Sequence, residues 1–196
     1  MYRVNEIFYS LQGEGRHTGR AAVFVRFSGC NLRCPFCDTD FAAYKPMAIA
    51  DIMNAISPWS ECGFVVLTGG EPSLQVDDAL VEELHRAGFY VAVETNGTHA
   101  LPDSVDWVTW SPKDGFNDHV PPLALSRIDE VKVVFDGEHN PEHYKGMAAG
   151  AYLCLQPCDT GDARRNREIT RRCVDFILRH PHWHLSLQTH KIIHIQ

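Results

Sequence analysis

The chain has 196 residues, of which 44% are apolar and 22% are charged, so it is long enough to bury a sizeable hydrophobic core. Its 18 Lys and Arg residues against 25 Asp and Glu residues give a formal net charge of -7, which argues against a direct nucleic-acid ligand. No run approaches the roughly 18 apolar residues of a membrane span, and the first residues lack an apolar signal core; both observations predict a cytoplasmic protein.

Short runs rich in β-branched and aromatic residues recur along the chain, with helix-like patterns between some of them. Strands are expected at residues 22–27, 64–68, 90–94, 106–110, 130–135, 152–156 and 185–188, and helices at residues 48–56, 74–87, 141–149 and 164–179. Residues 111–125, with three prolines, are expected to form a loop. A complete eight-fold barrel takes about 250 residues, so this alternation predicts an open, incomplete TIM-like barrel with a mainly parallel α/β sheet. We expect a single domain over residues 1–196.

Residues with chemical potential follow the ends of several expected strands. They are Cys30, Gly69-Gly70-Glu71-Pro72, Thr95-Asn96-Gly97, Ser111-Pro112-Lys113, Gln156 and Gln188. The carboxyl ends of parallel strands share one edge of a sheet, so these residues are expected to lie on one rim, where α/β folds place their active sites. The alternative is that Gly, Pro and Asn act there only as turn formers.

Cys30, Cys34 and Cys37 form a C-x3-C-x2-C loop directly after an expected strand. Three thiolates are one too few for structural zinc or for a closed cluster, so we expect a 4Fe-4S cluster with one iron left open for a substrate. The alternative is zinc held by the three cysteines and His17. The other four cysteines, at positions 62, 154, 158 and 173, are expected to be buried or inert thiols.

The cysteine spacing, with the aromatic Phe36 before the last cysteine, resembles the radical S-adenosylmethionine superfamily. Gly69-Gly70-Glu71 is similar to the GGE motif of that superfamily, which contacts the amino group of the cofactor. The resemblance implies that the open iron binds S-adenosylmethionine and that one-electron reduction yields a 5'-deoxyadenosyl radical, while the protein orients and shields the reactants.

Further segments from end to end resemble the 7-carboxy-7-deazaguanine synthase family. They are residues 11–15, 37–39, 94–97, 111–113, 156–157 and 185–191. This resemblance implies conversion of 6-carboxy-5,6,7,8-tetrahydropterin to 7-carboxy-7-deazaguanine with loss of ammonia, on the route to 7-deazapurines such as queuosine. It also implies a 4Fe-4S cluster, S-adenosylmethionine and Mg²⁺ as cofactors, a homodimer, and a reductant such as flavodoxin.

Carried over by position, the resemblance gives a set of residues that bind the pterin: Leu11, Gln12, Gly13, Glu14, Arg26, Thr68, Glu94, His190 and Gln196. The planar donors of Arg26 suit the substrate carboxylate, and Glu14 and Glu94 can accept hydrogen bonds from the aminopyrimidinone edge. The alternative for these charged residues is a solvated surface position.

The resemblance also implies a set of residues that contact S-adenosylmethionine: Phe36, Cys37, Asp38, Gly70, Glu71, Ser111, Pro112, Lys113, Gln156, Pro157, Cys158 and Asp159. Lys113 taken alone would be interpreted as a surface residue. Thr39 corresponds to the magnesium ligand of the family and joins the three cysteines as a catalytic residue; its alternative is a helix N-cap.

The chain departs from the family pattern at residues 42–47, where relatives often have a longer segment, and at Ala21, where proline is common. The short segment flanks Thr39, and its effect on the magnesium site stays open. Two rival functions are considered: an activase that makes a glycyl radical on a partner protein, and a non-enzymatic electron-transfer or zinc-binding module. The first leaves the motifs at residues 12–15 and 188–191 unexplained, and the second would not turn over S-adenosylmethionine.

Overall fold

The computed structural model describes residues 1–37 and 42–196. Within them, the strands are β1 (Tyr2–Leu11), β2 (Ala21–Phe27), β3 (Lys45–Met47), β4 (Phe64–Gly69), β5 (Tyr90–Thr95), β6 (Trp107–Trp110), β7 (Glu130–Phe135), β8 (Tyr152–Pro157) and β9 (Trp183–Leu185). The helices are α1 (Ile49–Ile56), α2 (Asp78–Arg86), α3 (Glu142–Met147), α4 (Ala163–Arg179) and α5 (Thr189–Ile193). None of the described helices is long and apolar enough to cross a membrane.

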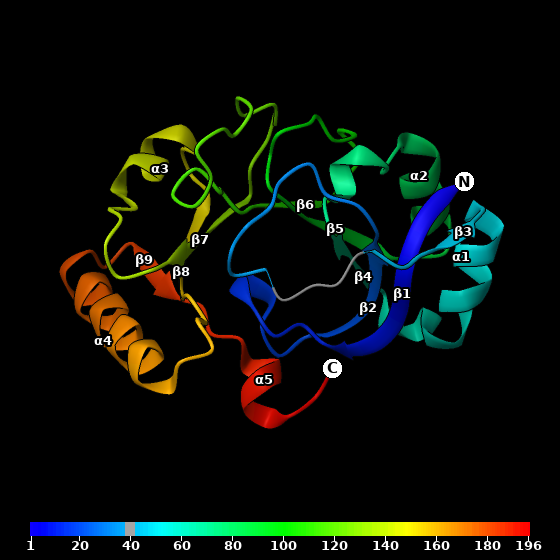
Figure 1. Ribbon diagram of the computed structural model, residues 1–196. Helices are drawn as coiled ribbons and strands as arrows, with labels where there is room; N and C mark the ends of the chain where they lie inside the picture. Colours follow the sequence, from blue (N-terminus) through cyan, green and yellow to red (C-terminus); the bar gives the residue numbers. More distant parts are fainter. Residues whose placement is uncertain (38–41) are drawn as a thin grey trace.

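The strands form one sheet in the order β3-β1-β2-β4-β5-β6-β7-β8-β9. From β2 onward all neighbours are parallel, whereas β1 pairs antiparallel with both β2 and β3. The sheet curls into an incomplete barrel with α1 to α4 outside, and α5 lies in the gap between the β8 and β1 sides (Figure 1). This arrangement confirms the predicted fold class of an open, mainly parallel α/β barrel.

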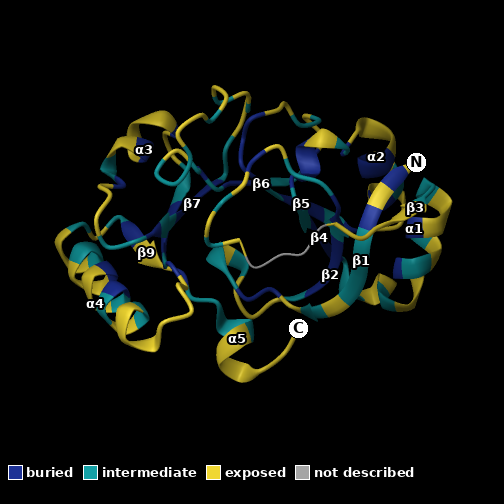
Figure 2. Cartoon of the chain, in the orientation of Figure 1, coloured by how far each residue is buried: buried dark blue, intermediate teal, exposed yellow. Residues whose placement is uncertain are grey.

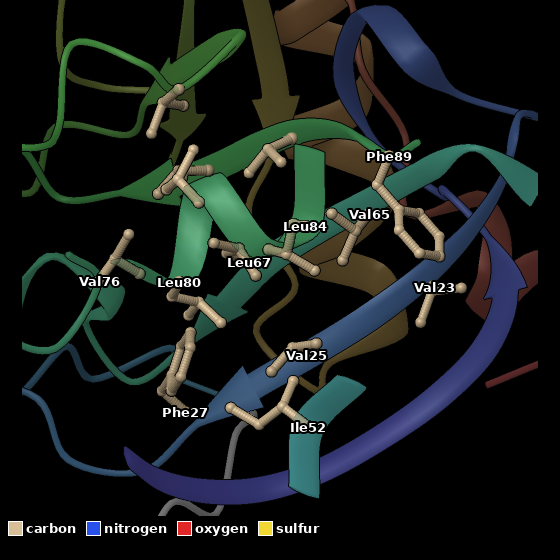
Figure 3. Packing of buried hydrophobic residues seen from close by; sticks show 14 of the residues in the cluster. Val23, Val25, Phe27, Ile52, Val65, Leu67, Val76, Leu80, Leu84 and Phe89 are labelled. Carbon is tan, nitrogen blue, oxygen red and sulfur yellow. The ribbon is translucent and has the colours of Figure 1, made fainter. Parts of the chain in front are cut away.

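Alternation of side chains along the strands separates an outer from an inner layer. In β2, the outward Val23, Val25 and Phe27 pack with Ile52 of α1 and the leucines of α2 (Figure 3). The intervening inward residues include Phe24, which packs in a small cluster inside the barrel. The central strands are therefore largely buried or half-buried (Figure 2), and a polar residue that alternates with outward apolar residues points into the barrel.

The expected strands and helices agree with the structure except near a few ends. Helix α2 begins at Asp78 instead of residue 74, because Leu74 belongs to a 3-10 turn and the Asp77 side chain caps the helix by accepting from the Leu80 amide at 3.0 Å. The last strand lies at Trp183–Leu185 and not at residues 185–188, so that prediction is wrong. Strands β1 and β3 and helix α5 were not expected.

A turn plugs the end of the barrel opposite the carboxyl ends of the parallel strands. It is the 3-10 turn η1 (Gly15–His17), in which Gly15 has a φ of +67°, a conformation that favours glycine. The Gly15 amide donates to the Ser186 hydroxyl at 2.9 Å, and the Arg16 amide donates to Glu130 at 3.2 Å. The plug places the preceding residues, among them Gln12 and Glu14, inside the barrel.

Candidate active site

A cavity of about 810 Å³ opens at the carboxyl ends of the parallel strands. It brings together most of the predicted site residues: Leu11, Gln12, Gly13, Glu14, Arg26, Cys30, Cys34, Phe36, Cys37, Thr68, Gly70, Glu71, Glu94, Ser111, Lys113, Gln156, Pro157, Cys158, Asp159, His190 and Gln196. Pro112 is buried and faces a small void on the α3 side instead of this cavity. Asp38 and Thr39 lie outside the described residues.

The cysteine loop leaves the end of β2 and is held by hydrogen bonds to neighbouring strand ends. Asn31 donates to Thr98 at 2.8 Å and accepts from Asn96 at 3.0 Å, both beyond the end of β5. The Cys30 sulfur accepts from the Leu32 amide at 3.4 Å, and the Cys34 sulfur accepts from Asn117 Nδ2 at 3.4 Å. Burial raises the pKa of the Cys30 thiol, and the neighbouring Glu71 carboxylate adds to this effect.

The donor set of this loop fits a cluster with three protein ligands. All three thiols line the same cavity, and their sulfurs are the soft ligands that iron–sulfur clusters require. Among the described residues, no group of three His, Cys, Asp or Glu side chains is arranged to hold a single metal ion. His17 in particular packs against Phe64 and Trp107 at the plugged end of the barrel, so the zinc alternative loses its fourth ligand.

The glycine-rich turn after β4 packs directly against the cysteine loop. The Gly70 amide donates to the Phe27 carbonyl at 2.9 Å, and the Glu71 amide donates to the Gly29 carbonyl at 2.8 Å. A Cβ atom on Gly70 would overlap the Gly29 carbonyl group. Glycine is therefore required at position 70 for a steric reason, and the two loops form one unit at the rim.

The Glu71 carboxylate is buried and accepts three hydrogen bonds. Its Oε1 atom accepts from the Ser73 amide at 2.9 Å and the Thr95 hydroxyl at 2.6 Å, and its Oε2 atom accepts from the Asn96 amide at 2.7 Å. These bonds join the ends of β4 and β5 and leave Glu71 at the cavity wall. Its side chain therefore has a structural role besides the predicted contact with the cofactor.

Replacing Glu71 with glutamine should destabilise the fold. All three partners of the Glu71 carboxylate are donors, so the NH₂ group of a glutamine would face another donor and leave a hydrogen bond unmade. This should lower the free energy of unfolding by about 2 kcal/mol. Urea denaturation followed by circular dichroism measures the effect. Glu82→Gln, at an exposed pair with Arg86 on α2, serves as the control and should change stability by less than about 0.5 kcal/mol. Equal stability of the Glu71 variant and the wild type would contradict the assignment.

Lys113 lies between the cysteine loop and the barrel interior. Its ammonium group donates to the carbonyl oxygen of Ser111 at 2.8 Å and also to the Ser111 hydroxyl. Burial lowers the pKa of Lys113, whereas the nearby Cys34 sulfur favours its charged form. The Lys113 carbonyl accepts from Asn117, so the loop after β6 links the lysine to the Asn117 donor that reaches Cys34.

In the cavity wall, Arg26 projects inward from β2 and forms an ion pair with Glu6 of β1. The Arg26 Nε atom lies 2.7 Å from Glu6 Oε1, and the other Glu6 oxygen accepts from the Gln196 side chain at 3.0 Å. Glu6 was not among the predicted site residues. In this structure it supplies the carboxylate partner of Arg26.

Three inward charged residues form a pair network on the floor of the cavity. The Lys132 ammonium of β7 lies 2.6 Å from Glu14 Oε2 and 3.1 Å from Glu94 Oε1. Glu94 also accepts from Gln12 at 2.9 Å, and Glu14 from Gln188 at 3.0 Å. Burial opposes the charge on Glu14, but the Lys132 ammonium and these hydrogen bonds lower the pKa of Glu14 to about 2.

The last residues of the chain cross the open side of the barrel. Thr189 donates to the Gly13 carbonyl through its amide at 3.0 Å, and Lys191 pairs with Asp159 at 3.0 Å. The Ser10 hydroxyl donates to the Gln196 carbonyl at 2.6 Å. A Cβ atom on Gly13 would overlap the His190 ring, so glycine lets this histidine approach the wall. The segment thus connects β8 to β1 across the gap in the sheet.

The alternation of charged and apolar residues in β7 indicates that Lys132 faces the cavity, although no sequence motif marks this residue. In β7, Glu130 and Lys132 alternate with Val131 and Val133, which pack outward under α3 and α4 or against the sheet edge. Because Val131 and Val133 occupy the outer face of the strand, Glu130 and Lys132 must point to its inner face, into the barrel. Other cavity residues that were not predicted include Asn5, Glu6 and Phe8 of β1 and Leu32 of the cysteine loop.

The remaining four cysteines have no common site. Burial raises the pKa of Cys154, and it raises the pKa of Cys173 to about 12, which agrees with inert thiols. Cys62 is half-buried near the start of β4 and donates to the Ala21 carbonyl at 3.2 Å. Cys158 is buried yet lines the main cavity, so it differs from the other three in facing the site.

Comparison with known proteins agrees with this geometry. Residues 24–118 match the family described as the Radical SAM superfamily. The chain is 51% identical to the 7-carboxy-7-deazaguanine synthase of Bacteroides thetaiotaomicron over 196 residues, with both chains fully covered. It is 44% identical to the protein of the same name from Bradyrhizobium diazoefficiens, with 100% of this chain and 99% of that protein covered.

Two solved structures share the fold of this chain. The crystal structure of QueE from Escherichia coli superposes with a TM-score of 0.79 at 28% identity, covering 95% of this chain and 93% of that chain. Streptococcus suis SuiB, at 13% identity and a TM-score of 0.52, shares the fold over 80% of this chain and 46% of its own. The chain therefore belongs to the 7-carboxy-7-deazaguanine synthase family of radical S-adenosylmethionine enzymes.

Proposed function

We propose that this enzyme converts 6-carboxy-5,6,7,8-tetrahydropterin to 7-carboxy-7-deazaguanine with loss of ammonia, and that it uses Mg²⁺ in addition to the cluster and S-adenosylmethionine of its superfamily. The observation that carries the proposal is one continuous cavity with three thiols at its rim and charged recognition groups, Arg26, Glu14 and Glu94, deeper in its walls. Such a cavity can hold a cofactor beside the cysteines and a small carboxylated ring beyond it.

The residues suit the two ends of the proposed substrate. Arg26 is already paired with the Glu6 carboxylate, and a guanidinium group in that position can also take a substrate carboxylate in planar geometry. Glu14 and Glu94 accept hydrogen bonds, and an aminopyrimidinone ring has N–H donors along one edge. The two ends of the ligand would then be held by groups of opposite charge, which orients the ring in the cavity.

When bound, the cluster and S-adenosylmethionine would supply the radical that removes a hydrogen atom from the substrate. The protein must hold the reacting C–H bond in near-attack geometry and keep water away. Cys30, Cys34 and Cys37 would hold the cluster, and the wall formed by Gly70, Glu71, Ser111 and Lys113 would contact the cofactor. The C-terminal segment at residues 188–196 covers the open side of the barrel and supports the exclusion of solvent.

The proposed partners are a second copy of the chain, as a homodimer, and a one-electron reductant such as flavodoxin. The support for both is family membership. Sedimentation of the purified protein tests the dimer, and electron transfer from reduced flavodoxin to the reconstituted protein tests the reductant.

Anaerobic reconstitution tests the proposed reaction directly. The protein is loaded with iron and sulfide, reduced, and incubated with S-adenosylmethionine, Mg²⁺ and 6-carboxy-5,6,7,8-tetrahydropterin, and the products are identified by mass. We expect 7-carboxy-7-deazaguanine together with ammonia. Formation of 5'-deoxyadenosine without the deazapurine would refute the substrate and leave the superfamily chemistry standing.

Thr39→Ala should raise the Mg²⁺ concentration needed for half-maximal rate by about tenfold or more, since one protein oxygen would be lost from a hard-cation site. Thr39 lies outside the described residues, so this prediction rests on the family resemblance. The measurement is product formation against Mg²⁺ concentration. Thr18→Ala, at an exposed hydroxyl bonded to the Gly15 carbonyl, is the control and should keep the wild-type requirement. An unchanged requirement in the Thr39 variant would favour its alternative role as a helix cap.

A further inference from the structure

Lys132 is a charged residue enclosed in the barrel, and its side chain is only 5% exposed. Its two carboxylate partners come from different parts of the fold: Glu14 precedes the plug turn and Glu94 lies on β5. Their side chains are 15% and 23% exposed, and all three residues line the cavity, with the lysine the least exposed of them. The lysine itself was not assigned any role from the sequence.

The other charged groups around Lys132 either accept hydrogen bonds from other residues or lie farther from its ammonium than Glu14 and Glu94 do. Glu130, two residues earlier on β7, accepts from the Arg16 amide, the Trp107 indole and the Thr109 hydroxyl, so three donors from the base of the barrel stabilise it. Further titratable groups that face this network are Lys113 after β6, Cys154 on β8 and His190 on α5. Within the described part of the chain, the ion pairs of the Lys132 ammonium are therefore those with Glu14 and Glu94.

The pairing leaves acceptor positions free toward the cavity. Glu94 uses Oε1 for both Lys132 and Gln12, and its Oε2 atom makes no hydrogen bond with the described residues. Each Glu14 oxygen has one partner, Lys132 or Gln188, and a carboxylate oxygen can accept two hydrogen bonds. The floor of the cavity therefore presents carboxylate oxygens that still have free acceptor positions.

We propose that Lys132 is a positioning residue that sets ring specificity: it fixes Glu14 and Glu94 as paired acceptors, so that the cavity selects a ring edge with N–H donors over one with carbonyl oxygens. This inference rests on the proposed function and adds to it the residue that enforces the choice of ring. In this role the lysine acts through the two carboxylates with which its ammonium is paired.

The effect of removing the ammonium follows from electrostatics. The two carboxylates would share a poorly hydrated site without a counter-ion, and one of them would take up a proton at neutral pH. A protonated carboxyl group is a donor, so it could face a ring carbonyl, which the charged pair rejects. Because that carboxyl group would then ionise only at higher pH, the ring preference should return as the pH rises.

Equilibrium binding of two fluorescent probes tests the proposal. They are 6-carboxypterin and 6-carboxylumazine, which differ in having an amino or an oxo group at ring position 2. Each is titrated anaerobically into reconstituted enzyme with bound S-adenosylmethionine, as wild type and as Lys132→Met. We expect the wild type to favour the pterin by about tenfold or more, and the variant to bind it about 10- to 100-fold more weakly with the preference lost near neutral pH.

Two further measurements separate positioning from a general structural role. Lys145→Met removes an exposed lysine of α3 that does not line the cavity, and this variant should keep the ring preference. In the wild type, the preference for the pterin over the lumazine should stay constant between about pH 5 and pH 7, because Glu14 has a pKa of about 2 and remains ionised. This wild-type measurement does not depend on whether the Lys132 variant folds.

The outcomes are distinguishable from those of the reaction assay. An enzyme that makes the deazapurine but binds the two probes equally well, or whose Lys132→Met variant keeps the wild-type preference at every pH, would overturn the inference alone. A loss of the wild-type preference for the pterin as the pH falls from about 7 to 5 would overturn it as well. Absence of the deazapurine from the wild-type reaction would instead refute the proposed function.

Discussion

Cys34→Ala is expected to abolish the cluster signal in electron paramagnetic resonance and to reduce 5'-deoxyadenosine formation below about a thousandth of the wild-type rate, because two thiolates cannot replace three. The fold itself should survive. Within residues 1–37 and 42–196, the Cys34 sulfur accepts from Asn117 alone, and Asn117 keeps its other hydrogen bond to the Lys113 carbonyl at 3.0 Å. Iron content, the spin-resonance signal after reduction and the deoxyadenosine yield are the measurements.

Cys62→Ala is the matched control for that variant. Cys62 is a half-buried thiol outside the cavity, and its loss should leave iron content and deoxyadenosine formation at wild-type levels. If the Cys34 variant retained the cluster signal while the control behaved normally, the assignment of the C-x3-C-x2-C loop to the cluster would be wrong.

Gly70→Ala should destabilise the protein by about 3 kcal/mol, since the new methyl group would overlap the Gly29 carbonyl and neither backbone segment can rotate away. For a chain of this length, such a change lowers the melting temperature by about 6–12 °C. The overlap also displaces the Cys30 backbone nitrogen, so cluster loading should fall with stability. Thermal denaturation and iron content after reconstitution measure the two effects.

The control for this substitution is Gly146→Ala in α3. A Cβ atom at position 146 meets nothing within 4 Å, and alanine is favoured over glycine in a helix by about 0.5–1 kcal/mol. The two alanine substitutions should therefore change stability in opposite directions. A Gly70 variant as stable as the Gly146 variant would contradict the close packing of the two loops.

The parallel part of the fold could be predicted from the sequence because its signals are local. The β-branched runs of β4, β5 and β7 end at glycine, asparagine or aspartate, and their lengths match the observed strands closely. The rim of the site followed from the same reasoning, since strand ends that share a direction must share an edge.

The missed elements depend on partners far away in the chain. Polar residues such as Arg3 and Asn5 interrupt the apolar pattern of β1, and its register against β2 shifts between Val4 and Glu6. The pairing of Glu6 with Arg26 depends on that register, which no local pattern reveals. The last strand was misplaced because Trp183 anchors it in the core, whereas Ser186 leaves the strand and bonds to Gln156 at 2.8 Å.

The contact between Trp107 and Glu130 gives the enzyme an internal optical reporter. The Trp107 indole donates to the Glu130 carboxylate at 3.2 Å, and Glu130 lies two residues from Lys132 on the same inward face. Indole emission responds to the charge of a hydrogen-bonded neighbour, so ligand binding above the floor should change the fluorescence of Trp107. A Trp107→Phe variant identifies the share of the protein fluorescence that comes from Trp107. Binding of unlabelled ligands could then be followed in real time without turnover.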